Sequence, residues 1–237
     1  MTGSKRVQVL RNSWRMLGFR ETLMAVLHHL SRPDEFGEGS SFDRKYGFDT
    51  DGKVEVSELG VDEADRDGAM LYYPLKPKIL RYVLSSLDID YADYTFIDIG
   101  AGKGRNLLVS AAFPFRCRIG VEFSRPLCEI ARRNLAIGAR HGMANESVEI
   151  WEGNALDYVF PQGKLVVLMY YPFQSDVTRA FLSSVESQLE RQPRELLVAA
   201  ICPRERAVFE EFPFLKLTTD FRVPRDDWCW CLYESRI

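Results

Sequence analysis

The stretch Thr95-Phe-Ile-Asp-Ile99, followed at once by Gly100-Ala-Gly-Lys-Gly104, decides the fold class of this chain. Its first half is a short apolar run with the aromatic and β-branched residues of a buried strand. The alternate glycines after it allow a tight turn in which the backbone approaches a ligand closely. A helix is expected from Arg105 onward. A strand, a glycine turn and a helix in this order indicate an α/β fold with a nucleotide site at the carboxyl end of the strand.

Strands and helices alternate on both sides of this turn. Such alternation predicts a mostly parallel sheet with helices packed on both faces. The expected strands are 95–99, 118–122, 148–151, 165–170 and 196–201, and the expected helices are 77–87, one from 105, 126–141 and 177–190. The last two apolar segments, 215–219 and 228–234, are too close for a crossover helix, so they are predicted to form an antiparallel hairpin.

The glycine spacing discriminates among nucleotide ligands. The dinucleotide fingerprint G-x-G-x-x-G needs glycine at position 105, which is Arg105, so the spacing disfavours NAD. A phosphate-binding P-loop needs G-x-x-x-x-G-K-[S/T], and Lys103 has neither the upstream glycine nor the hydroxyl neighbour. The turn therefore predicts a nucleoside ligand of another kind.

Glu122 is the second candidate binding residue. It ends the predicted strand Arg118–Glu122, where a carboxylate can accept hydrogen bonds from both hydroxyls of a ribose. An exposed strand-end glutamate without a ligand is the alternative.

The run Phe96-Ile-Asp-Ile-Gly-Ala-Gly-Lys-Gly-Arg105, with Glu122 after it, resembles the first motif and the following acidic residue of the class I S-adenosylmethionine-dependent methyltransferases. The resemblance covers about residues 72 to 234. It implies a Rossmann-like α/β fold with a seven-stranded sheet whose last strand is antiparallel, and S-adenosyl-L-methionine as cofactor. It also implies that the methionine end of the cofactor is received by Asp98, Gly100, Ala101, Gly102 and Gly104.

The resemblance extends to later segments. Gly153-Asn154-Ala155 looks like the adenine-contacting motif, in which Asp is more usual than Asn154, and an amide oxygen can still accept from the adenine amino group. Phe123, Tyr170 and Tyr73 complete the predicted cofactor site. Tyr171, Pro172 and Phe173 follow the fourth strand, where the family faces its acceptor, and are the candidate catalytic residues. Related enzymes that methylate amide or exocyclic nitrogens carry Asn or Asp where Tyr171 stands.

The acceptor is left open by these motifs. Phe42-Asp-Arg-Lys-Tyr-Gly-Phe-Asp-Thr50, together with the glycine turn, is similar to a group of bacterial methyltransferase-like proteins whose substrates are not known to us. The long first motif with Arg105 also looks like that of seven-strand protein-lysine methyltransferases. The prediction is methyl transfer to a protein side chain such as lysine or to a small molecule. The alternative is a catalytically inactive partner module that only binds the cofactor.

Composition limits the partners. The 237 residues are 46% hydrophobic with a net charge of -3, which suits one globular domain with an extension and gives no support for nucleic acid binding. The five cysteines lack paired C-x-x-C spacing, so no metal is expected. No apolar run approaches the roughly 20 residues that cross a bilayer, and the expected location is cytoplasmic.

The N-terminal third differs from the rest in composition. Residues 7–30 loosely follow a helical period, with a basic side that predicts a solvated face in preference to peripheral membrane contact. Residues 31–68 are rich in Gly, Ser, Asp and Glu and predict an irregular, lid-like segment. We therefore expect an arm and lid over 1–70 and a cofactor-binding domain over 71–237. Candidates for a cover over the cofactor are Tyr46, Asp49, Thr50 and Tyr72-Tyr73-Pro74.

Overall fold

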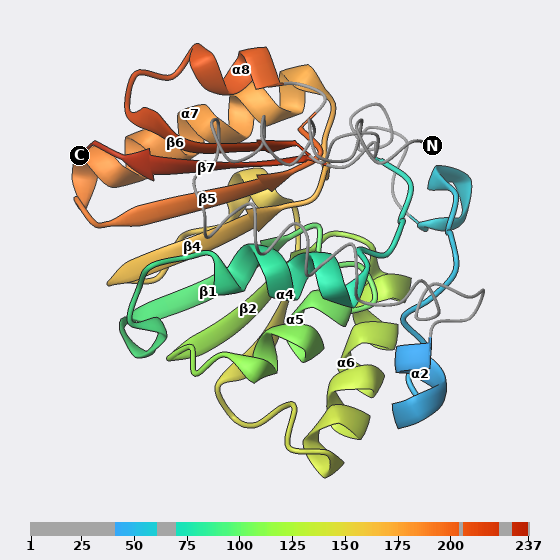
Figure 1. Cartoon of the computed structure of the whole chain (residues 1–237). Helices are drawn as coiled ribbons and strands as arrows, with labels where there is room; N and C mark the ends of the chain where they lie inside the picture. Colours follow the sequence, from blue (N-terminus) through green and yellow to red (C-terminus); the bar gives the residue numbers. More distant parts are fainter. Residues whose placement is uncertain (1–40, 61–69, 204–205, 223–228, 237) are drawn as a thin grey trace, which may run out of the picture.

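The computed structural model describes residues 41–60, 70–203, 206–222 and 229–236. In this part of the chain the strands form one seven-stranded sheet in the order β3-β2-β1-β4-β5-β7-β6 (Figure 1). The strands are β1 (Tyr94–Ile99), β2 (Cys117–Glu122), β3 (Val148–Glu152), β4 (Lys164–Met169), β5 (Leu196–Ile201), β6 (Leu215–Arg222) and β7 (Cys229–Ser235). The α-helices are α2 (Ser41–Tyr46), α4 (Pro77–Ser85), α5 (Arg105–Val109), α6 (Arg125–Arg140), α7 (Ser175–Arg191) and α8 (Arg206–Glu210).

The pairing confirms the predicted fold class. Strands β1 to β5 run parallel, and β7 is antiparallel to both β5 and β6, between which it lies. The predicted C-terminal hairpin is therefore formed, and its second strand extends the parallel sheet: Ile201 pairs with Trp230.

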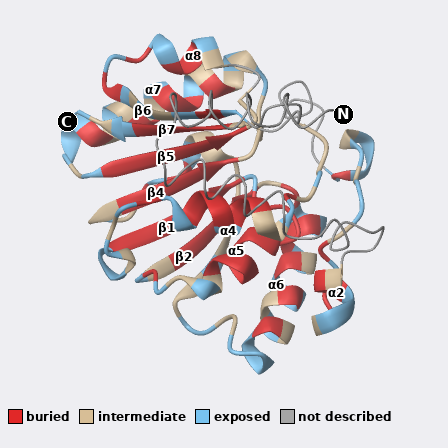
Figure 2. Cartoon of the chain, in the orientation of Figure 1, coloured by how far each residue is buried: buried red, intermediate tan, exposed pale blue. Residues whose placement is uncertain are grey.

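Helices cover both faces of the sheet because neighbouring residues of each strand point to opposite sides. In β1, Phe96 belongs to the core shared with α4 and α5, while Ile97 and Ile99 belong to the core shared with α7 and α8. Helix α6 packs beside α5 on the first face. The central strands are buried along their length (Figure 2). Each fully buried Phe, Leu or Ile contributes about 1.5–3 kcal/mol to folding.

Two of the described α-helices, both short, were not predicted from the sequence. Helix α2 lies within the stretch that we expected to be irregular, and α8 precedes β6. They have six and five residues, which is too few to show a helical period. The expected helical arm over 7–30 lies outside the described residues.

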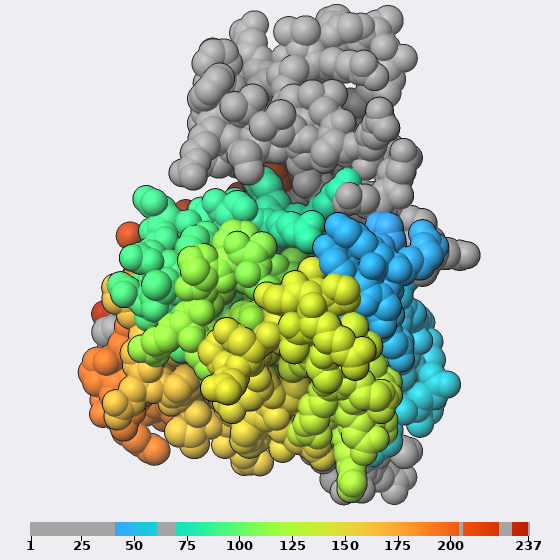
Figure 3. Space-filling view, turned by 90° about the horizontal axis from the view of Figure 1, so that it is seen from below, coloured from blue at the N-terminus to red at the C-terminus, as the bar shows by residue number. Residues whose placement is uncertain are grey.

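Residues 41–60 pack against the main body of the protein. Phe42 and Phe48 are buried in the core on the α4–α5 side, and the ring of Tyr46 lies 5.4 Å from that of Phe42 and 5.3 Å from that of His141, which follows α6. Figure 3 shows this segment, in blue, lying against the yellow-green surface of α6. The segment is thereby placed beside the helix that follows Glu122.

Among the described residues, no helix is long and apolar enough to cross a membrane. The cytoplasmic location stays a prediction.

Candidate functional site

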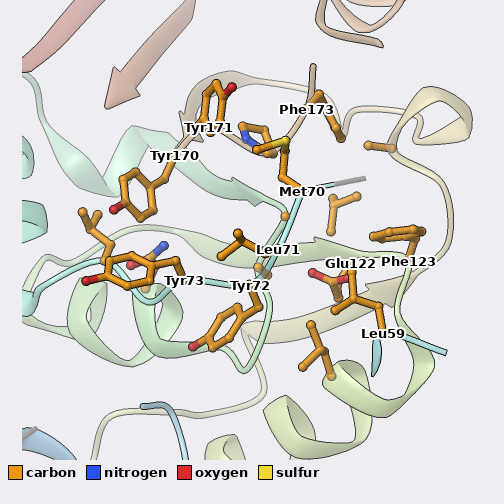
Figure 4. A pocket seen from close by; sticks show the side chains of 18 of the residues that line it. Leu59, Met70, Leu71, Tyr72, Tyr73, Glu122, Phe123, Tyr170, Tyr171 and Phe173 are labelled. Atoms are coloured by element: carbon orange, nitrogen blue, oxygen red, sulfur yellow. The ribbon is translucent and has the colours of Figure 1, made fainter. Parts of the chain in front are cut away.

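A cavity of about 250 Å³ opens at the carboxyl ends of β1, β2 and β4, the edge at which parallel sheets of this kind bind ligands. The glycine turn after β1 and Glu122 form one wall. The segment from Met70 to Leu75, every residue of which lines the cavity, forms another (Figure 4).

Eleven of the fourteen predicted site residues line this one cavity. On the side of the glycine turn and of β2 and β3 these are Gly100, Ala101, Glu122, Phe123, Asn154 and Ala155. On the side of β4 and the 70–75 segment they are Tyr73, Tyr170, Tyr171, Pro172 and Phe173. The other three, Asp98, Gly102 and Gly104, are not among the lining residues.

Gly102 is enclosed between an aromatic ring and a carboxylate. Its φ of 53° lies in the left-handed region, and a Cβ built on it would lie 2.2 Å from the ring of Tyr72. Its N–H donates to Oε2 of Glu122 at 2.8 Å. Only glycine fits this position, so the path of the turn is set by packing and by a hydrogen bond together.

Glu122 links the ends of β1 and β2. Besides the bond from Gly102, its Oε1 accepts from the N–H of Ser124 at 2.8 Å. Burial raises the pKa of Glu122, while these backbone donors favour the ionised form. A carboxylate has about four acceptor sites, and with the N–H of Phe123 as a third backbone donor one site remains for a ligand hydroxyl.

Asp98 and Asn106 place unsatisfied oxygens near the glycine turn. Asp98 is buried, and its Oδ1 accepts from Nδ2 of Asn106 at 3.2 Å. Among the described residues, Oδ2 of Asp98 and Oδ1 of Asn106 have no hydrogen-bond partner. Burial, with a smaller contribution from the charge of Glu122, raises the pKa of Asp98 to about 7, although the hydrogen bond from Asn106 acts in the opposite direction. Buried acceptors without donors are costly, so this end of the cavity suits a ligand that carries N–H donors.

The turn after β4 holds a strained residue. Tyr171 has a φ of 47°, a conformation that non-glycine residues adopt at a cost of about 1–3 kcal/mol. Tyr171, Pro172 and Phe173 line the main cavity together with Tyr73, whose side chain is among the most exposed large apolar ones. The lining of the cavity therefore combines these aromatic side chains with the carboxylate of Glu122.

Asn154 has a local role as well. Its Oδ1 accepts from the N–H of Leu156 at 3.0 Å and so caps the short 3₁₀ helix Ala155–Asp157. The oxygen that we assigned to an adenine amino group is therefore already engaged in the local turn.

Several lining residues were not predicted from the sequence. Arg105 and Asn106 line the cavity and adjoin the glycine turn, and their polar side chains were the available signal. Leu59, Met70 and Leu71 also line the cavity, and their types and spacing give no such signal. In the described part of the chain no group of His, Cys, Asp or Glu residues is suited to hold a metal ion.

Comparison with known proteins gives structural likenesses only. No family model and no curated protein matches the sequence. The putative methyltransferase yhhF from Escherichia coli aligns with a TM-score of 0.55 and 15% identity over 69% of this chain and 88% of its own. A predicted N6-adenine-specific DNA methylase from Listeria monocytogenes aligns with a TM-score of 0.53 and 15% identity over 68% of this chain and 51% of its own. With this strand order and these neighbours, the chain has the Rossmann-like fold of the class I methyltransferases.

Proposed function

We propose that this protein is an S-adenosylmethionine-dependent methyltransferase whose cofactor binds in the cavity beside the glycine turn. The observation that carries the proposal is the hydrogen bond between Gly102 and Glu122, because it joins the two strand ends that would hold a nucleoside and lies at the wall of the cavity. The methyltransferase descriptions of proteins that share the fold support the same reading.

The chemistry of the lining fits this cofactor. Glu122 can accept from a ribose hydroxyl, and the free oxygens of Asp98 and Asn106 can accept from a protonated amino group. An ammonium near Asp98 would also favour its ionised form. The aromatic side chains of the cavity suit a positively charged sulfonium, because ring faces attract cations.

When bound, the cofactor would supply a methyl carbon that the acceptor's lone pair attacks in line, while the carbon–sulfur bond breaks and the sulfur leaves as a neutral thioether. The residues of the chain have to position the acceptor and exclude water. A lysine ammonium has no lone pair, so it would have to lose a proton to solvent before the transfer. Tyr171, Pro172 and Phe173 line the cavity, and we assign them to the acceptor. A phenol can hydrogen-bond an amine or a hydroxyl. We propose a protein side chain such as lysine, or a small molecule, as the acceptor.

Calorimetric titration with S-adenosylmethionine, S-adenosylhomocysteine and NAD tests the cofactor. We expect saturable binding of the first two and none of NAD. Glu122→Gln should weaken binding by about ten- to a hundredfold, because a hydrogen bond to a charged group contributes about 1.5–3 kcal/mol.

Glu152→Gln is the matched control. Glu152 lies opposite Glu122 in the β2–β3 register, is exposed and accepts from Arg132 instead of facing the cavity. The affinity of the Glu152→Gln variant for S-adenosylmethionine should stay within about twofold of that of the wild type. Binding of NAD alone, or equal effects of the two substitutions, would contradict the proposed site.

A module that binds the cofactor without transferring the methyl group is the second candidate. It is kept because Tyr171 stands where related enzymes that methylate amide or exocyclic nitrogens carry Asn or Asp. Formation of S-adenosylhomocysteine with a panel of lysine peptides and small amines or phenols separates the two. Turnover with any of them excludes the binding-only module.

A further inference from the structure

The short turn Asp49–Asp51 meets the glycine turn from a part of the chain about 50 residues earlier. Arg105, the first residue of α5, is buried and lines the cavity, and its Nε donates to Oγ1 of Thr50 at 2.7 Å. Its Nη2 lies 3.3 Å from Oδ1 of Asp51 and 3.6 Å from Oδ1 of Asp43. A buried guanidinium is tolerated only when it is paired and hydrogen-bonded in this way.

Asp43 builds the turn that receives Arg105. Its carboxylate accepts from the N–H of Thr50 at 2.6 Å, from the N–H of Asp51 at 2.7 Å and from the Thr50 hydroxyl. Thr50 is completely buried. Its hydroxyl donates to the carboxylate of Asp43, which can only accept, and accepts from the guanidinium of Arg105, which can only donate. One hydroxyl thus connects the acidic turn with the start of α5.

The 49–51 turn also contacts Lys103 of the glycine turn. Lys103 Nζ donates to Oδ1 of Asp49 at 2.9 Å and to the carbonyl of Asp51 at 2.8 Å. Asn134 of α6 donates from Nδ2 to the carbonyls of Asp49 and Lys103, at 2.8 and 2.9 Å. The two turns are therefore bonded to each other directly and through a third element.

Tyr72 carries the contact to the centre of the glycine turn. Its hydroxyl donates to the carbonyl of Thr50 at 2.6 Å, and its ring packs where a Cβ on Gly102 would be. Gly102 is thus held by Glu122 through its N–H and by the 49–51 turn through Tyr72. Phe42 and Phe48 anchor this segment in the core by apolar packing, independently of the charges.

We propose that Thr50 and Arg105 are positioning residues of the cofactor site: through the 49–51 turn they fix the backbone geometry that the glycine turn presents to the ligand. This inference rests on the proposed function. It makes the segment 42–51 a required part of the cofactor site although Thr50 does not line the cavity. The sequence motifs Phe42–Thr50 and Asp98–Arg105 then act together to fix the backbone of the glycine turn.

Thr50→Val and Thr50→Ser test the inference. Val keeps the size of the side chain and removes the hydroxyl, whereas Ser restores the hydroxyl. We expect Thr50→Val to weaken S-adenosylhomocysteine binding about tenfold, the effect of one hydrogen bond to a charged group, and Thr50→Ser to stay within about threefold of the wild type. Rescue by Ser is not expected if Thr50 only fills space.

Hydrogen exchange of the ligand-free protein gives a second readout. In Thr50→Val, peptides covering 99–105 should exchange at least fivefold faster, while those covering β5 and β7 should be unchanged. If Thr50→Val does not fold, Lys103→Met removes two bonds from the same turn at a residue outside the cavity lining and is measured in the same way.

The two readouts separate the inference from the proposed function. Unchanged exchange over 99–105 in a folded variant, or wild-type affinity in Thr50→Val, overturns the positioning role. A wild-type protein that binds neither S-adenosylmethionine nor S-adenosylhomocysteine overturns the proposed function, and the exchange rates still decide whether the 49–51 turn holds the glycine turn.

Discussion

Tyr72 occupies the space that a side chain on residue 102 would need, since Cε2 of its ring lies 2.2 Å from a Cβ built on Gly102. Gly102→Ala therefore destabilises the protein in two ways. An alanine in the left-handed region costs about 1–2 kcal/mol, and overpacking against the ring costs about 1–3 kcal/mol. We expect it to lower the free energy of unfolding by about 3 kcal/mol and to abolish cofactor binding. Urea unfolding and calorimetry measure the two effects.

Gly142→Ala is the control for this substitution. Gly142 has a φ of 70°, but a Cβ there would meet nothing within 4 Å. Gly142→Ala should lower the free energy of unfolding only by the cost of the left-handed backbone, about 1–2 kcal/mol, and should bind the cofactor with wild-type affinity. Equal losses at the two positions would show that the Tyr72 ring moves aside without cost.

The sequence was sufficient to predict the features that depend on local pattern. The turn from Gly100 to Gly104 has its glycines where the backbone needs positive φ, and Glu122 follows the next apolar run by simple counting. The alternation of strands and helices gave the parallel sheet, and the short spacing before β7 gave the hairpin.

The contacts that complete the site depend on tertiary structure. Thr50 and Arg105 are 55 residues apart, and no periodicity relates them. Leu59 reaches the cavity only because residues 41–60 pack beside α6, a placement set by Phe42 and Phe48 in the core. The side-chain oxygen of Asn154 caps its own turn, a local competition that motif comparison does not resolve.

Phe48 anchors the segment that carries Thr50. It is buried beside Phe42, with ring centroids 5.3 Å apart. Phe48→Ala should lower the free energy of unfolding by about 3–5 kcal/mol, as expected for a core aromatic, and should also weaken cofactor binding. Val159→Ala, at an exposed position, should change neither quantity beyond about 0.5 kcal/mol. A loss below about 1 kcal/mol in Phe48→Ala would mean that the segment is dispensable for the core.

Tyr171 is strained where the proposed acceptor binds. Its φ is 47°, so Tyr171→Gly relieves the backbone strain while removing the packing of the ring. These effects offset each other, and the free energy of unfolding should stay within about 1 kcal/mol of the wild type. Tyr171→Val, which is β-branched and disfavours this backbone region more strongly, should lower it by about 2 kcal/mol. Both variants should bind the cofactor and transfer the methyl group more slowly. If Gly destabilises as much as Val, packing and not backbone conformation decides the residue at this position.

Asp98 should make the stability of the ligand-free protein depend on pH. Burial, with a further contribution from Glu122, raises the pKa of Asp98 from 3.8 to about 7 in the folded state. Between these values the native state binds more protons than the unfolded state, so the free energy of unfolding falls as the pH rises from about 4 to 7 and then levels off. The raised pKa of Glu122 acts in the same direction.

Asp98→Asn removes this proton. The unfolding free energy of the variant minus that of the wild type should therefore increase between pH 5 and 7 and level off above about pH 8, as measured by urea unfolding at each pH. Asp157→Asn, at an exposed carboxylate, is the control in which the difference should change little. A flat difference for Asp98→Asn would mean that the folded protein keeps Asp98 ionised throughout. In that case a positive charge must already be close to Oδ2 of Asp98, and this oxygen would not be the binding position of a cationic ligand group.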